Sequence, residues 1–90
     1  MATTLIDPAA NAEPGVDTMA ALMKQMAKGK GQSGYVVFVR HRMVPGAQPK
    51  FGRPEGTRDE ATRVALGMLD TPHFVKAWTV GRDGIYEVTR

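Results

Sequence analysis

Ninety residues provide for one small domain, and this chain carries twelve Lys and Arg against nine Asp and Glu, for a net charge of +3 at pH 7. Without the N-terminal tail, residues 33–90 have a size at which folding buries only about 60% of the surface of the unfolded chain, so the stability of the domain is marginal. The absence of cysteine excludes disulfides and cysteine-ligated metal sites. The longest apolar run, Tyr35 to Val39, is too short to span a bilayer.

Residues 1–10 contain no basic n-region and no continuous apolar stretch, so we expect no signal peptide. We therefore expect a cytoplasmic protein without membrane contact, or a protein of the virion or host cytosol if its origin is viral. Residues 1–16 are rich in Ala, Pro, Gly, Asn and Thr. Such a segment buries too little surface to offset the entropy lost on ordering, so we expect it to form an extended arm.

A short amphipathic helix is predicted after the arm. Asp17 or Thr18 can cap it, and glycines end it before a Gly-rich linker, so that helix and linker occupy residues 17–32. Its apolar positions recur at helical spacing and form one stripe, which consists of Met19, Leu22, Met23 and Met26. Because methionine adapts to many surfaces, this stripe is a candidate partner-binding surface. The alternative is that it packs on the sheet of its own domain.

Residues 33–90 have the pattern of a compact strand–helix–hairpin domain. Residues 35–42 are predicted to form a buried strand, because the run is apolar on both faces. Residues 43–56 contain three prolines and three glycines, so we expect a long irregular loop. Loops of this length in small domains are often functional.

A capping box from Thr57 to Glu60 predicts a helix over residues 57–70. A hairpin follows, in which we treat Arg82-Asp83-Gly84 as a three-residue loop with Gly84 in the left-handed conformation. This register places one apolar set on a single core face, with two cross-strand pairs: Val80 with Tyr86, and Trp78 with Val88.

Together these elements predict an α+β fold with a small three-stranded sheet of residues 35–42, 73–80 and 85–90. The capped helix would lie on one face. The Met-rich helix would precede the domain and either cover the other face or dock on a partner, and the extended arm would lie outside. The connection from the first strand through the capped helix is compatible with a right-handed crossover to a parallel strand.

Charge is distributed unevenly along the chain. Residues 1–20 contain acidic residues and no Lys or Arg, whereas residues 21–54 contain seven basic residues and no acidic one. This segregation suggests an anionic partner, although a solvated basic surface is the ordinary alternative. The candidate contacts to nucleic acid lie at the strand end and in the loop, and they are Arg40, Arg42, Lys50, Phe51 and Arg53.

The sequence gives little support to a catalytic or a metal-binding function. Ser33, the only serine, has no nucleophile-elbow context, and the Gly-rich segment around it lacks the pattern of a phosphate-binding loop. His41 and His73 lie far apart in the sequence, without the spacing of metal ligands. We therefore expect no enzyme, no metal site and no cofactor. A small RNase-type toxin that uses these histidines is the third hypothesis for function.

Protein docking is the function class that the pattern favours. An arm that does not fold alone, a methionine stripe and a long Pro/Gly loop are each typical of segments that become ordered on a partner. We expect a non-enzymatic accessory subunit or inhibitor of a larger protein assembly, of which a virion decoration or adaptor protein and an inhibitor of a host complex are examples. A nucleic-acid-binding accessory protein that uses residues 40–53 is the alternative.

Overall fold

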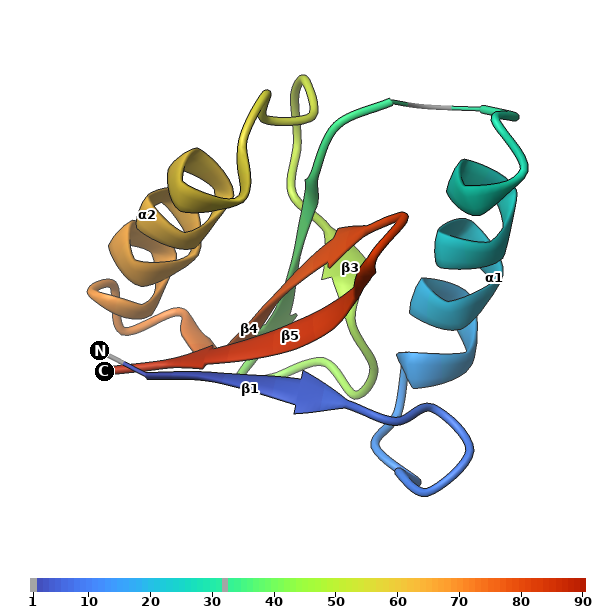
Figure 1. Ribbon diagram of the computed structural model, residues 1–90. Coiled ribbons are helices and arrows are strands. Elements are labelled where there is room, and N and C mark those ends of the chain that lie inside the picture. The colour runs from blue at the N-terminus through green and yellow to red at the C-terminus, as the bar shows by residue number, and fades with distance from the viewer. Residues whose placement is uncertain (1, 32) are drawn as a thin grey trace.

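The computed structural model describes residues 2–31 and 33–90. These form a five-stranded antiparallel sheet between two helices, with the strand order β1-β5-β4-β2-β3 (Figure 1). The helices are α1 (Val16–Ala27) and α2 (Arg58–Leu69). The strands are β1 (Ala2–Ile6), β2 (Val36–His41), β3 (Gln48–Pro49), β4 (Phe74–Gly81) and β5 (Gly84–Thr89).

The predicted three-stranded sheet is wrong, because the sheet has an additional strand at each edge. The segment predicted as an extended arm contains β1, whose five residues all pair with β5. The segment predicted as an irregular loop contains β3, in which Gln48 and Pro49 pair with β2. Pro49 has no N–H group to donate, and an edge strand tolerates this because only one side of it is paired.

The Met-rich helix is part of the domain and not an element that precedes it. α1 follows β1 and covers one face of the sheet (Figure 1). Gly15, with a φ of 94°, is its N-cap, and no side chain caps it, so the predicted cap at Asp17 or Thr18 is wrong. The core on this face is a cluster of buried residues from α1 and the sheet that includes Val16, Met19, Met26, Phe38, Trp78, Val80 and Ile85.

The second helix covers the opposite face, and its predicted N-cap is confirmed. The Thr57 hydroxyl accepts a hydrogen bond from the Glu60 N–H at 3.1 Å. Ala61 and Ala65 of α2 are fully buried, and their small side chains let the helix approach the sheet closely. The core on this face consists of buried residues from α2 and the strands: Val37, Val39, Ala61, Ala65, Ala77 and Val88.

The predicted crossover from the first strand through the capped helix to a parallel strand is also wrong. β2 and β4 run antiparallel, with Val36 opposite Val80. A connection through α2 therefore returns the chain to the neighbouring position in the opposite direction. As a result every named strand pair in the sheet is antiparallel.

The predicted hairpin register is wrong by one residue. Gly81 pairs with Gly84, so Arg82 and Asp83 form a two-residue turn, and Trp78 lies opposite Glu87. The φ of Gly84 is positive, as predicted, at 149°. Because helices cover both faces of the sheet, β5 has apolar side chains on both faces, such as Ile85 on one and Val88 on the other. The apolar pattern alone therefore does not select the register.

Candidate docking surface

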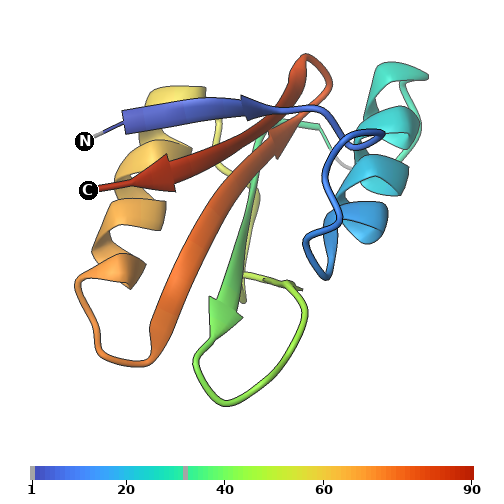
Figure 2. The same cartoon turned by 90° about the horizontal axis from the view of Figure 1, so that it is seen from below.

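The segment between β2 and α2 contains two loops, one before β3 and one after it. Residues 42–47 form a loop at the end of β2 that projects away from both helices (Figure 2). Residues 51–54 form a second loop after β3. Three large apolar side chains in this segment are exposed: Met43 at 75%, Val44 at 46% and Phe51 at 103%. In the described part of the chain, the other exposed large apolar side chains are Leu5 and Val75.

Residues 51–54 are held at both ends, and we call them the clamped loop. The Lys50 N–H donates to the carbonyl of Val37 at 2.7 Å, and Tyr35 and Glu55 exchange two backbone hydrogen bonds of 2.8 Å. The Lys50 Nζ lies 3.2 Å from Glu55 Oε2, so an ion pair joins the two residues that flank the loop. The base of the loop is therefore fixed to the sheet, while Phe51 at its start is fully exposed.

Two of the four basic candidates are engaged within the fold. The guanidinium of Arg40 forms an ion pair with Glu13, and its side chain is 20% exposed. Lys50 is the cation of the clamp. Arg42 and Arg53 are exposed. The positive charge that this segment offers to a partner is therefore smaller than the sequence suggests.

Glu13 is a residue that the sequence interpretation missed. Besides Arg40, its carboxylate contacts Lys76 Nζ at 3.0 Å. The acidic first segment and the basic middle segment therefore neutralise each other in part within the molecule. The uneven charge distribution was the signal available for this contact, because opposite charges in separate segments pair when the chain brings them together.

The methionine stripe is occupied by the molecule's own core. Met19 is 0% exposed and Met26 is 6% exposed. Leu22 and Met23 are half-buried and pack against the same cluster. In this conformation the four candidates cover the sheet, so they present little surface to a partner.

The fold brings His41 and His73 together. Their ring centroids are 6.1 Å apart and the ring planes differ by 14°, and Phe74 contacts both rings with edge-to-face geometry. The N–H of Met43 donates to His41 Nδ1 at 3.1 Å, which ties the start of the 42–47 loop to the histidine. Within residues 2–31 and 33–90, no group of three or more His, Asp or Glu residues could hold a metal ion.

Neither helix of the described residues is long and apolar enough to cross a membrane. Comparisons with protein-family models, with curated proteins and with solved structures found no match to this chain. The geometry of its own residues therefore carries the functional argument.

Proposed function

We propose that this chain is a non-enzymatic docking module that binds a larger protein or assembly through the clamped loop and the neighbouring 42–47 loop. The observation that carries the proposal is the complete exposure of Phe51 on a loop whose two ends are fixed to the sheet. Exposing a large aromatic side chain to water is unfavourable, and a partner pocket that buries it gains the corresponding free energy. The absence of cysteine agrees with a cytoplasmic module.

The fixed base of the clamped loop favours binding, because less conformational entropy is lost on binding than when a flexible loop becomes ordered. Aromatic and arginine side chains are enriched among residues that dominate interface energetics. Phe51 and Arg53 supply both within one loop of four residues, and the apolar Met43 and Val44 extend the exposed surface. A suitable partner site has an apolar pocket for the aromatic ring and a carboxylate close to it.

Fewer segments take part in the proposed docking than the sequence analysis suggests. β1 and the methionine stripe are used by the sheet and the core, so the exposed loops carry the interaction. A partner that competes for α1 would have to expose Met19 and Met26, which are buried.

A nucleic-acid-binding accessory protein is the second candidate, and the exposed ring of Phe51 beside Arg53 favours it specifically. Bases stack on exposed aromatic rings, and arginines contact phosphates. This candidate is weaker than protein docking because Arg40 and Lys50 have intramolecular acidic partners. The apolar Met43 and Val44 also offer nothing to a phosphate backbone.

One pull-down experiment separates the two candidates. Tagged wild-type protein, Phe51→Ala and Leu5→Ala are incubated with lysate from the source cells, each with and without nuclease. Leu5 is 61% exposed on β1, so its variant is a matched loss of exposed apolar surface elsewhere. We expect a discrete protein that wild type and Leu5→Ala retain, that Phe51→Ala loses, and that nuclease leaves in place.

The affinity for the captured protein should fall by about 2 kcal/mol for Phe51→Ala, as for a central interface residue. Equal retention of the captured protein by wild type and both variants would contradict the proposal. Loss of the captured material in the nuclease arm would favour the nucleic-acid candidate instead.

A further inference from the structure

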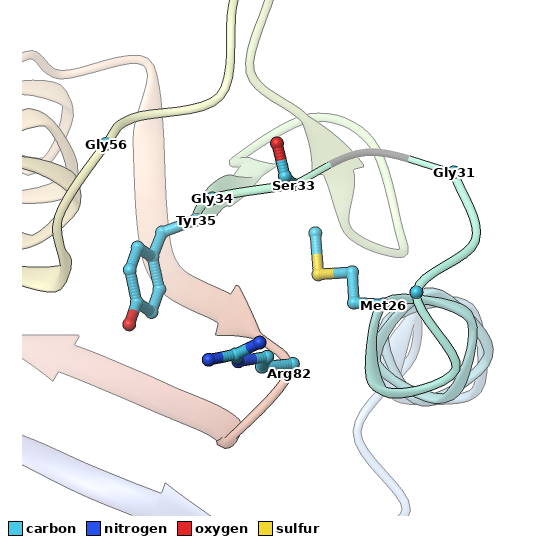
Figure 3. A pocket seen from close by; sticks show the side chains of 8 residues that line it. Met26, Gly31, Ser33, Gly34, Tyr35, Gly56 and Arg82 are labelled. Atoms are coloured by element: carbon cyan, nitrogen blue, oxygen red, sulfur yellow. The ribbon is translucent and has the colours of Figure 1, made fainter.

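A cavity of about 330 Å³ lies on another part of the molecule, between the end of α1 and the β4–β5 turn (Figure 3). The other lining residues precede β2 or α2, and they are Gly29, Gly31, Ser33, Gly34, Tyr35 and Gly56. The side chains that line it are those of Met26, Ser33, Tyr35 and Arg82. This volume falls within the range of small-molecule sites in proteins.

The aromatic wall of the cavity is preformed. The Arg58 guanidinium lies 4.8 Å from the centroid of the Tyr35 ring. A Cβ added at Gly81 would lie 2.5 Å from Tyr35 Cε1, so the ring packs directly on the Gly81 backbone. Gly34 lies equally close to the Glu55 carbonyl, where an added Cβ would be 2.5 Å from the oxygen. A ligand would therefore find these walls already in place.

The cavity has an uncompensated positive charge. Arg82 is the one charged side chain among its lining residues. Its neighbour Asp83 forms an ion pair with Arg58, and Glu55 forms one with Lys50. Among the ion pairs within residues 2–31 and 33–90, none involves Arg82. The carboxylates next in sequence to the lining residues Arg82 and Gly56 are thus engaged in other ion pairs.

We propose that this cavity binds a small organic anion, a phosphate monoester or a carboxylate, with its charged group on Arg82 and its apolar body against Met26 and Tyr35. A guanidinium pairs with both kinds of anion through two parallel hydrogen bonds. The thioether of Met26 offers a polarizable apolar surface. The inference is independent of the docking function, because the lining residues of the cavity lie outside the 42–47 loop and the clamped loop.

The position of α1 makes the binding depend on Arg82. The cavity borders the C-terminal end of this helix, where the helix dipole carries partial negative charge. Without the guanidinium, no charged side chain among the lining residues would offset this unfavourable field. Neutralising Arg82 should therefore weaken the binding of anions strongly.

The test is a titration of ¹⁵N-labelled protein with phenyl phosphate, followed by amide chemical shifts. Benzoate and phenol are titrated in parallel: benzoate carries a carboxylate on the same ring, and phenol lacks the anionic group at neutral pH. We expect saturable shifts confined to the amides around the cavity, such as those of Gly31, Gly34 and Gly56, with phenyl phosphate, benzoate or both. The stronger of the two identifies the anionic group that the cavity prefers.

The variants are Arg82→Gln and, as the matched control, Arg63→Gln on the exposed side of α2. Arg82→Gln should weaken binding at least about tenfold, the effect of losing a charged hydrogen-bond partner, while Arg63→Gln leaves it unchanged. The melting temperatures should stay equal because both side chains are exposed. The proposal is overturned if neither phenyl phosphate nor benzoate produces localised shifts at about 10 mM, if phenol binds equally well, or if both variants lose binding equally.

Discussion

Glu13, in the loop between β1 and α1, forms an ion pair with Arg40 near the end of β2. The same carboxylate lies 3.0 Å from Lys76 Nζ in β4, so one acidic residue joins the N-terminal segment to two neighbouring strands. The side chains of Glu13 and Arg40 are 19% and 20% exposed. Removing Glu13 leaves Arg40 largely buried without this acidic partner, and removing Arg40 leaves Glu13 with Lys76 alone. Losing such a largely buried contact is more costly than losing an exposed pair.

Arg40→Gln should therefore lower the free energy of unfolding by about 1–3 kcal/mol. Arg42→Gln is the matched control, because Arg42 is exposed, and its effect should stay within about 0.5 kcal/mol. Urea denaturation of both variants at neutral pH measures the difference. Equal stabilities would show that the Glu13 contact contributes nothing to the fold.

The N-terminal segment offers a second test of the fold. Ile6 is 9% exposed in the core under α1, whereas the adjacent Leu5 is 61% exposed. Ile6→Asp should cost about 2–4 kcal/mol, because it buries an unpaired carboxylate, and Leu5→Asp should cost much less. Thermal unfolding followed by circular dichroism checks this. Two identical melting temperatures would mean that β1 is not part of the folded sheet in solution.

Two glycines should respond in opposite directions to alanine. Gly67 is exposed inside α2, and a Cβ added there meets nothing within 4 Å, so Gly67→Ala should stabilise the protein by about 0.5–1 kcal/mol. At Gly81 the added Cβ would lie 2.5 Å from the Tyr35 ring, so Gly81→Ala should destabilise it. Differential scanning calorimetry reads both changes. The packing of Tyr35 on Gly81 is refuted if Gly81→Ala melts at or above the wild-type temperature.

Arg58 should not be replaceable by lysine. Its guanidinium lies 4.8 Å from the Tyr35 ring centroid and 4.2 Å from the Tyr86 ring centroid, and it also donates to the Thr79 hydroxyl at 2.7 Å. An ammonium cannot stack in this way or make the same set of hydrogen bonds. Arg58→Lys should cost about 1–2 kcal/mol in urea denaturation, whereas the exposed Arg63→Lys should change little. Equal effects of the two substitutions would contradict the account.

The sequence predicts the elements whose signals are local. The capping box at Thr57 marks the start of α2, and the apolar run from Tyr35 marks β2. The edge strands lack such signals. β1 is mostly exposed and short, and β3 has two residues, one of them Pro49. Both strands exist because of pairing with distant residues, which no local pattern records.

The candidate site is likewise predictable only in part, because some of its features are local in the sequence and others depend on tertiary contacts. Phe51 and Arg53 stand out in a Pro/Gly-rich segment without any structure. The clamp between Lys50 and Glu55 and the pairing of Arg40 with Glu13 depend on tertiary contacts. The sequence therefore suggests more basic charge for binding a partner than the folded molecule offers, because Glu13 and Glu55 neutralise part of it.

Whether Phe51 enters a pocket of a protein partner can be tested by site-specific photo-crosslinking. A photoreactive benzoylphenylalanine replaces Phe51 in one variant and the exposed control residue Leu5 in another, and both variants are irradiated in source-cell lysate. The account predicts one discrete protein adduct from position 51 that is absent from position 5. Adducts that are the same at both positions, or an adduct at position 51 that nuclease removes, would contradict it.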